Sequence, residues 1–225
     1  MSVILDLLFP PKCAFCGKLL DKAGDICTEC ETNLPFRPEA EVLTAIGKNA
    51  YPTAIALYYD SMVAEGVKAL KFGKKSWRSR VFARYIAQTA AEHLAGSFDA
   101  VTFVPVSWQR NFERGFDQAR LLAAETAKIW GVQAQPTLRK VRHTKAQSSL
   151  SDPSQRSQNV SGAYSVPRPN RVRGRRFLLI DDVCTTGSTM AAAADALLEA
   201  GAEAVVCAAL AGGHEKVENT WKENS

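Results

Sequence analysis

Histidine is scarce in this sequence, with three copies among 225 residues. His93 falls on the apolar face of an expected helix, His143 lies in a basic segment and His214 lies near the end. We expect ordinary roles for all three. No Ser-His-Asp or Cys-His arrangement stands out, so the sequence gives no support to nucleophilic catalysis of that kind.

Long apolar runs are missing as well. No segment approaches the roughly 18 continuous apolar residues of a membrane span. The apolar start MSVILDLLF lacks a basic flank and carries an acid at Asp6, which is not the pattern of a secretory signal. We therefore expect a cytoplasmic protein that does not span a membrane.

Charge is nearly balanced over the whole chain but unevenly distributed along it. The 28 basic and 23 acidic residues give a net charge of +5, which alone is weak support for a polyanionic partner. Residues 1–60 hold 5 basic and 8 acidic residues, a net charge of −3, whereas residues 137–176 hold 10 and 1, a net charge of +9. The positive charge is concentrated in this later segment.

From residue 53 onward, apolar residues alternate between strand-like and helix-like spacing. The expected strands cover 53–59, 99–106, 132–138, 177–181 and 204–210. The expected helices cover 61–71, 81–94, 116–131 and 188–200. This alternation predicts an α/β fold with a parallel sheet flanked by helices, and the length suffices for one such core plus a small appendage. Residues 139–176 are a long polar loop, which in a compact domain is usually functional or mobile.

The stretch from residue 177 to 189 reads FLLIDDVCTTGST, an apolar strand followed by two acids and a loop of small residues. An acid pair is costly to desolvate, so Asp181 and Asp182 are expected to face a ligand, a metal or solvent. Beyond the strand, the free N–H groups of the next helix form a phosphate cradle, and Gly187 allows close approach. Four side chains add hydroxyl donors, those of Thr185, Thr186, Ser188 and Thr189.

The acids and the loop predict different parts of one ligand. Carboxylates repel a phosphate, so Asp181 and Asp182 should meet neutral hydroxyl groups of the same molecule. A 5-phosphorylated ribose fits, with its hydroxyls on the acids and its phosphate on the loop. The alternative is that the threonines only start a helix and that the acid pair is solvated.

Four of the six cysteines are close together near the start of the chain, in the pattern C-x2-C-x10-C-x2-C. Two such pairs can surround one tetrahedral Zn²⁺ in a closed structural site, whose ligands would be Cys13, Cys16, Cys27 and Cys30. Disulfides or unpaired thiols are the alternatives. Cys207 is expected in the core, and Cys184 is expected to be more exposed.

Several stretches together resemble a known family. FLLIDDVCTTGST resembles the phosphoribosyl pyrophosphate (PRPP) signature of type I phosphoribosyltransferases. The order and content of four further stretches resemble the competence protein F (ComF) family, namely LFPPKCAFCG (8–17), VKALKFGKK (67–75), FVPVSWQRNFERGFDQARLLA (103–123) and LRKVRHTKAQSSLSDPSQRSQNVSGAY (138–164). This resemblance implies a zinc ribbon at 1–36, a linker or hood at 37–52 and a phosphoribosyltransferase-like domain at 53–225.

The resemblance also implies a PRPP site. It assigns the ribose and its 5-phosphate to Asp181, Asp182, Val183, Cys184, Thr185, Thr186, Gly187, Ser188 and Thr189. It assigns the pyrophosphate to FVPVS (103–107) at the end of a second strand, with contributions from Val106, Ser107, Arg110 and Arg114, and it puts Lys71 nearby. The alternative is a strand that leaves the core at Pro105 without a ligand.

In type I transferases a mobile basic loop closes over PRPP, and here the basic segment holds Arg139, Lys140, Arg142, Lys145 and Arg156, with Gln147 and Asn159 as neutral donors. We expect Arg142 to bind PRPP, and Arg139 and Lys140 to act with Asp181 and Asp182 in catalysis. A solvated loop and a nucleic-acid binding segment are the alternatives. PRPP implies Mg²⁺, with a contact to Asp181 or Asp182 through water.

Two functions follow from the resemblance. The first is a PRPP-binding protein that handles incoming single-stranded DNA in natural transformation, at the cytoplasmic side of the inner membrane and with competence proteins as partners. The second is an active transferase on an unidentified base, with the ribbon and residues 31–52 as a hood. Family members commonly have Asn where RGFDQA has Asp117, which adds a negative charge but also suits a helix start.

Overall fold

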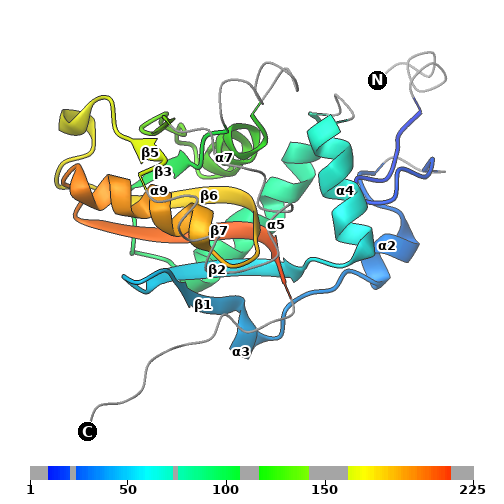
Figure 1. Cartoon of the computed structure of the whole chain (residues 1–225). Coiled ribbons are helices and arrows are strands. Elements are labelled where there is room, and N and C mark those ends of the chain that lie inside the picture. Colours follow the sequence, from blue (N-terminus) through cyan, green and yellow to red (C-terminus); the bar gives the residue numbers. More distant parts are fainter. Residues whose placement is uncertain (1–9, 21–23, 73–75, 107–116, 142–161, 214–225) are drawn as a thin grey trace, which may run out of the picture.

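The computed structural model describes residues 10–20, 24–72, 76–106, 117–141 and 162–213. Its main feature is a five-stranded sheet in the order β1-β2-β7-β6-β3 (Figure 1). The strands are β1 (Leu43–Ile46), β2 (Tyr51–Tyr58), β3 (Ala100–Phe103), β6 (Arg176–Cys184) and β7 (Ala204–Gly212). β1 runs antiparallel to β2, whereas β2, β7, β6 and β3 are parallel. The carboxyl ends of four strands therefore meet at one edge of the sheet.

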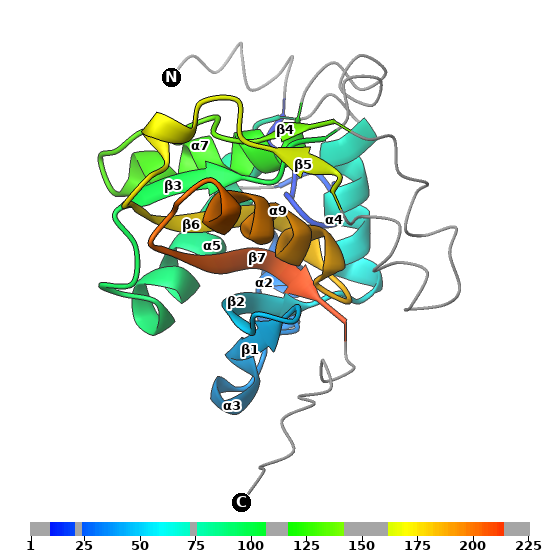
Figure 2. The same cartoon turned by 60° about the vertical axis from the view of Figure 1, so that its left-hand side comes forward.

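Helices cover both faces of the sheet (Figures 1 and 2). α9 (Ser188–Glu199) packs on one face, and α5 (Arg78–His93) and α7 (Gln118–Ile129) pack on the other. α4 (Ser61–Phe72) leads from β2 toward α5. The remaining elements are short, namely α2 (Thr28–Thr32), α3 (Glu39–Val42), the 3-10 turn η2 (Pro169–Arg171) and the two-stranded sheet of β4 (Arg139–Lys140) and β5 (Tyr164–Ser165).

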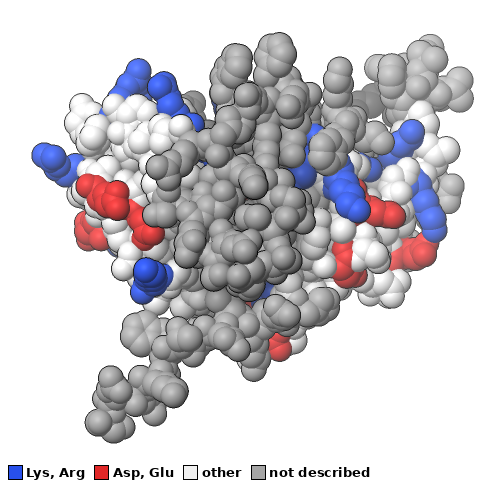
Figure 3. Space-filling model, viewed as in Figure 1, with Lys and Arg blue, Asp and Glu red and all other residues white. Residues whose placement is uncertain are grey.

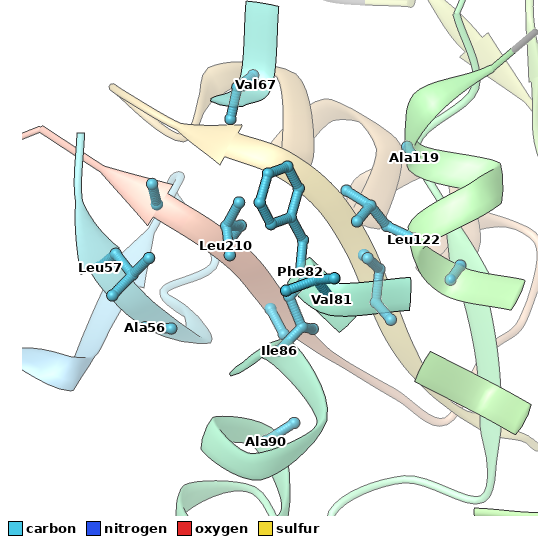
Figure 4. Close-up of a cluster of buried hydrophobic side chains, with 14 of the residues drawn as sticks. Ala56, Leu57, Val67, Val81, Phe82, Ile86, Ala90, Ala119, Leu122 and Leu210 are labelled. Carbon is cyan, nitrogen blue, oxygen red and sulfur yellow. The ribbon is translucent and has the colours of Figure 1, made fainter. Parts of the chain in front are cut away.

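The core on the α5 face is built around one aromatic ring. Phe82 of α5 is fully buried and points between Leu210 of β7 and Leu122 of α7, with Ile86 one turn further along its own helix (Figure 4). Burying side chains of this size stabilises the fold by about 1.5–3 kcal/mol each. The periodicity of α5 and α7 thus fixes both helices against β6 and β7.

The cysteine-rich segment shares this same core. Phe15 is 1% exposed, and its ring lies 5.1 Å from that of Phe82 and 6.2 Å from that of Tyr85, measured between centroids. Gly66 of α4 allows the close approach, because a Cβ there would lie 3.3 Å from Cα of Phe15 and 3.4 Å from the carbonyl oxygen of Ala14. The segment is packed into the groove between α4 and α5.

Most expected elements are present within a few residues of their predicted bounds. The strand expected at 132–138 is wrong: Gln135 donates one main-chain hydrogen bond to Val101, but Pro136 interrupts any ladder, and the next strand begins at Arg139. Residues 37–52, expected as a linker or hood, contain α3 and β1. Among the described helices, none has both the length and the apolar character needed to cross a bilayer.

Candidate functional site

The acid pair lies at the carboxyl end of β6, where the sheet opens. Asp182 is 8% exposed and Asp181 is half-buried. The N–H of Asp182 donates to Oδ1 of Asp181 at 2.8 Å. Nζ of Lys71, in the last turn of α4, contacts Oδ2 of Asp182 as an ion pair. Lys71 was expected near the pyrophosphate, and here it is a partner of the acid pair.

The two carboxyl groups have opposite pKa shifts. Burial raises the pKa of Asp181 well above its ordinary value, and the neighbouring charge of Asp182 adds to the rise. Burial also acts to raise the pKa of Asp182, but the ammonium of Lys71 outweighs it and holds that pKa below the ordinary value. Asp182 is therefore the member of the pair that more readily stays ionised, and Asp181 is the one that more readily takes a proton.

The loop after β6 leads directly into α9. The N-cap of α9 is Gly187, in the left-handed conformation with φ of 72°, and no side chain caps this helix. The hydroxyls of Thr186 and Ser188 instead lie 2.8 Å apart, and Thr185 is exposed. Ser188 N also donates to Oγ1 of Thr186 at 3.5 Å, so Thr186 contributes to the start of α9 although it is not its N-cap residue. The first-turn N–H groups of α9 have no intrahelical partner and, with the helix dipole, favour an anion.

Gly187 is required by packing as well as by its backbone conformation. A Cβ at this position would lie 2.6 Å from both Cβ and Cγ2 of Ile46, the fully buried last residue of β1. Gly47, the residue after Ile46, lies equally close to α9. A Cβ added at Gly47 would lie 2.5 Å from Cβ of Ala191. The β1–β2 hairpin therefore packs against the loop between β6 and α9 and supports it, a role that the sequence did not predict.

The segment after β3 is held by Asp117. The side chain of this N-cap residue of α7 accepts from Arg120 N at 3.1 Å and from Val106 N at 2.9 Å. Burial raises the pKa of Asp117. The helix-start interpretation is confirmed, and the added charge is compensated by two N–H groups. The N–H of Val106 is consequently already in use and is not a free donor for a pyrophosphate.

Two expectations about single cysteines have different outcomes. Cys207 is fully buried in β7, as predicted. Cys184 is 2% exposed at the end of β6, so its expected exposure is wrong, and burial raises the pKa of its thiol to about 12. The side chain of residue 184 points into the α9 core because strand residues alternate between faces and β6 runs on to this position. Its thiol cannot contact a ligand directly.

Arg139 and Lys140 form β4 and line a cavity of about 620 Å³ together with Val106 and Asp117. Within the described part of the chain, the lining of this cavity does not include the acid pair. Other predicted residues lie outside the described residues, namely Ser107, Arg110, Arg114, Arg142, Lys145, Gln147, Arg156 and Asn159, as do His143 and His214.

The four cysteines near the start form one cluster. Their sulfur atoms all lie within 4.8 Å of one another, and Sγ of Cys16 lies 3.7 Å from Sγ of Cys27. Zn²⁺ bound to four thiolates at about 2.3 Å holds sulfurs about 3.8 Å apart, so the cluster fits this ion. Cys30 N donates to Sγ of Cys27 at 3.5 Å, as expected around a metal thiolate. With no open position, the site is structural.

A buried arginine adjoins this cluster. Arg78, at the start of α5, is 1% exposed, and its Nη2 donates to the carbonyl oxygen of Cys13 at 3.3 Å. Its Nε and Nη1 are buried with no hydrogen-bond partner in the described part of the chain. Zn²⁺ bound to four thiolates would carry a net charge of −2, and this negative charge would compensate the positive charge of the buried guanidinium beside it. No local pattern in the sequence marks Arg78 for this position.

Two family models match the chain in agreement with these sites. The model described as phosphoribosyl transferase domain matches residues 118–223, and the one described as double zinc ribbon domain matches residues 4–53. The second stretch contains four cysteines and no histidine, which provide ligands for one closed zinc site of this kind. The fold is thus a phosphoribosyltransferase-like α/β domain preceded by a zinc ribbon.

Curated relatives match over most of the chain. "Competence protein F" of Haemophilus influenzae is 30% identical over 87% of this chain and 82% of its own length. "DNA utilization protein YhgH" of Salmonella typhimurium is 28% identical over 86% of both chains. "Competence protein ComFC" of Bacillus subtilis is 25% identical over 86% of this chain and 74% of its own.

Proposed function

The chain belongs to the competence protein F family, and from this premise we propose that it binds PRPP at the carboxyl end of its sheet and handles incoming single-stranded DNA in natural transformation. Its place would be the cytoplasmic side of the inner membrane, next to other competence proteins. The names of the relatives refer to competence and DNA utilization, and the phosphoribosyl transferase family model covers the segment with the acid pair.

One observation carries the PRPP proposal: an acid pair and an anion-binding loop are adjacent at the same end of β6. Asp181 and Asp182 lie near the end of β6, and α9 begins six residues after Asp182, with no side-chain cap at its N-cap residue Gly187. Asp182 would accept hydroxyl hydrogen bonds from the ribose, and the first turn of α9 would bind the 5-phosphate. Lys71 would keep Asp182 ionised for this purpose.

Mg²⁺ would accompany the ligand. The ion prefers water, phosphate and one or two carboxylates, and we assign the water-mediated contact to Asp181 because it is more exposed than Asp182. Arg139 and Lys140, which form β4, would contact the pyrophosphate, and the basic segment that begins with them would shield it from water.

Calorimetry of the zinc-loaded protein with PRPP and Mg²⁺ tests this site. We expect Asp181→Asn/Asp182→Asn to lose binding by at least about tenfold, because two acceptors for the ribose hydroxyls are changed. Glu199→Gln/Glu203→Gln is the matched control, since it removes the same charge from two exposed positions. Equal affinity of wild type and the acid-pair variant would reject the site.

Single-stranded DNA binding is tested separately by fluorescence anisotropy with a labelled oligothymidine. Phosphate contacts predict an affinity that falls steeply with salt. The absence of binding at low salt would reject DNA handling without affecting the PRPP site.

One observation favours an active transferase as a second candidate. Ile46 at the end of β1 packs against the loop at Gly187, so one end of the stretch proposed as a hood over an acceptor base adjoins the proposed PRPP site. Pyrophosphate release from PRPP with a panel of bases distinguishes the candidates. Turnover with any base would establish the transferase, and PRPP binding without turnover would favour a regulatory ligand.

A further inference from the structure

A groove lined by basic side chains runs along the β3 edge of the sheet, and the acid-pair site does not account for it. It consists of the cavity of about 620 Å³ and an adjoining one of about 530 Å³, which share Pro136, Thr137 and Arg171 in their linings. Six cations line the two cavities, which together we call the basic groove: Arg120, Arg139, Lys140, Arg168, Arg171 and Arg175. Their side chains come from α7, from β4 and from both sides of η2.

Most of this charge is unpaired. In the part of the chain that the structure describes, Arg120, Arg139, Arg168 and Arg171 form no ion pair, and all four are exposed. The one acid in the lining is Asp117, whose two carboxylate oxygens accept backbone N–H groups. Among the described lining residues, six cations therefore stand against one acid, which favours a polyanionic ligand.

The surface view shows the same asymmetry. Lys and Arg side chains project at the upper left of Figure 3, in the part of the molecule where Figure 1 places η2, and the acidic side chains on this side of the view lie lower, over α9. The main chain at the bottom of the groove is held in place, because Gln135 N donates to Val101 and Thr102 Oγ1 lies 2.7 Å from Oγ1 of Thr137. The groove is thus a fixed feature of the sheet edge.

We propose that the basic groove binds the sugar-phosphate backbone of single-stranded nucleic acid. The inference rests on the proposed DNA-handling function and names the surface that carries it. Two adjoining cavities with cations along both suit a chain of phosphates, whereas a single phosphorylated sugar needs only one. Three prolines, Pro105, Pro136 and Pro167, add apolar surface to the lining.

The groove overlaps the proposed pyrophosphate end of the PRPP site at Val106, Arg139 and Lys140, but it extends beyond that site along η2. Neither the acid pair nor residues 185–189 belong to the described lining of either cavity. Arg168 precedes η2 and Arg171 is its last residue; both are exposed and lie outside β6, α9 and the loop between them, so they can be changed without altering those elements.

Charge reversal at these two arginines tests the proposal. Anisotropy with a labelled oligothymidine is measured for Arg168→Glu/Arg171→Glu across salt concentrations. Loss of two phosphate contacts should lower affinity about 60-fold at about 50 mM salt and about tenfold at about 200 mM, and should reduce the salt slope by about 1.4. Lys48→Glu/Lys128→Glu is the matched control, because it makes the same change in net charge at exposed positions outside the groove.

PRPP affinity of the same variants separates the two sites. We expect Arg168→Glu/Arg171→Glu to bind PRPP as wild type does and the control variant to keep both ligands. If wild type and the groove variant bind the oligonucleotide equally well, the basic groove is not the DNA-binding surface, although the proposed DNA-handling function is retained. If the groove variant loses PRPP but keeps DNA, the groove belongs to the PRPP site and the proposal fails. If wild type binds no oligonucleotide, the proposed function itself fails.

Discussion

The ammonium group of Lys71 contacts Oδ2 of Asp182, and this ion pair joins the end of α4 to the carboxyl end of β6. The two side chains are 24% and 12% exposed, so the pair is largely shielded from solvent. Burial opposes the charge on both groups, yet the pKa of Lys71 is raised by Asp182 and that of Asp182 is lowered by Lys71. Each group therefore depends on the other to remain ionised.

Replacing Lys71 with methionine should destabilise the protein by about 3 kcal/mol at neutral pH. The substitution keeps most of the side-chain volume but leaves Asp182 buried without its cation. Urea unfolding measures the change, and Lys68→Met, three residues earlier on an exposed face of α4, is the control. A loss no larger than that of Lys68→Met would show that the ion pair contributes little.

The same variant should have a different pH dependence. A lowered carboxyl pKa stabilises the folded state above the ordinary value of 3.8, and this contribution is lost as pH falls through the folded pKa. In Lys71→Met the buried Asp182 takes up a proton at higher pH, which relieves the penalty. The difference in free energy of unfolding between wild type and variant should therefore narrow from about pH 7 to about pH 4; a constant difference would contradict the ionised pair.

Substitution of Gly187 by alanine should disrupt the loop before α9. The new Cβ would lie 2.6 Å from two atoms of Ile46, in addition to the cost of φ at 72°. Gly174→Ala is a matched control, since its φ is 67° and nothing lies within 4 Å of the added Cβ. We expect a loss of about 1 kcal/mol for Gly174→Ala and at least about 3 kcal/mol for Gly187→Ala.

PRPP titration of these two glycine variants separates stability from binding. Because β1 supports the loop, Gly187→Ala should also lower the affinity for PRPP by at least about tenfold, whereas Gly174→Ala should leave that affinity unchanged. Equal effects of the two substitutions on stability would mean that the contact with Ile46 relaxes at no cost.

Asp117 should be more than a helix cap. Asp117→Ala removes acceptors for both Arg120 N and Val106 N and should lower the free energy of unfolding by about 2 kcal/mol. Asp117→Asn retains one acceptor oxygen and should cost about half as much. Urea unfolding compares the three proteins, and hydrogen exchange at Val106 reports the second bond directly. Unchanged protection of Val106 in the alanine variant would contradict the anchoring role.

The elements that the sequence predicted well are those fixed by nearby residues. The strand, loop and helix of residues 176–199 are consecutive, and each has a local cause. The strand follows from an apolar run, the loop from a glycine and the helix from an alanine-rich segment. The ribbon was predicted because cysteine spacing alone specifies four zinc ligands. In both cases the chemistry lies within about 25 residues of chain.

The contacts that the sequence did not predict join distant segments. Lys71 is 111 residues from Asp182, and Ile46 is 141 residues from Gly187, so no periodicity connects them. β1 was missed because Leu43–Ile46 is short and half-exposed, which leaves no clear alternation. The strand expected near residue 135 reflects apolar residues that pack beside β3 without forming a ladder.

Arg78 should strengthen zinc binding through its charge. The guanidinium is buried against Cys13, and replacing it by methionine removes the positive charge beside a zinc-thiolate centre with net charge −2 while keeping an apolar side chain. Outer-shell partners of this kind change metal affinity by about 10–100-fold, so we expect Arg78→Met to bind zinc at least about tenfold more weakly in competition with a chromophoric chelator. Arg176→Met, which removes a half-exposed arginine paired with Asp99 at the other end of β6, is the control.

A purely structural arginine predicts a different result. Replacing a buried charge by an apolar side chain is often neutral or stabilising when no opposite charge is nearby. Because the cysteines of the cluster carry the net charge of −2 only as zinc-bound thiolates, Arg78→Met should destabilise the zinc-loaded protein and leave the zinc-free protein unchanged or more stable. Equal destabilisation of both forms, measured by urea unfolding with and without a chelator, would show that Arg78 serves packing between α5 and the ribbon rather than the metal.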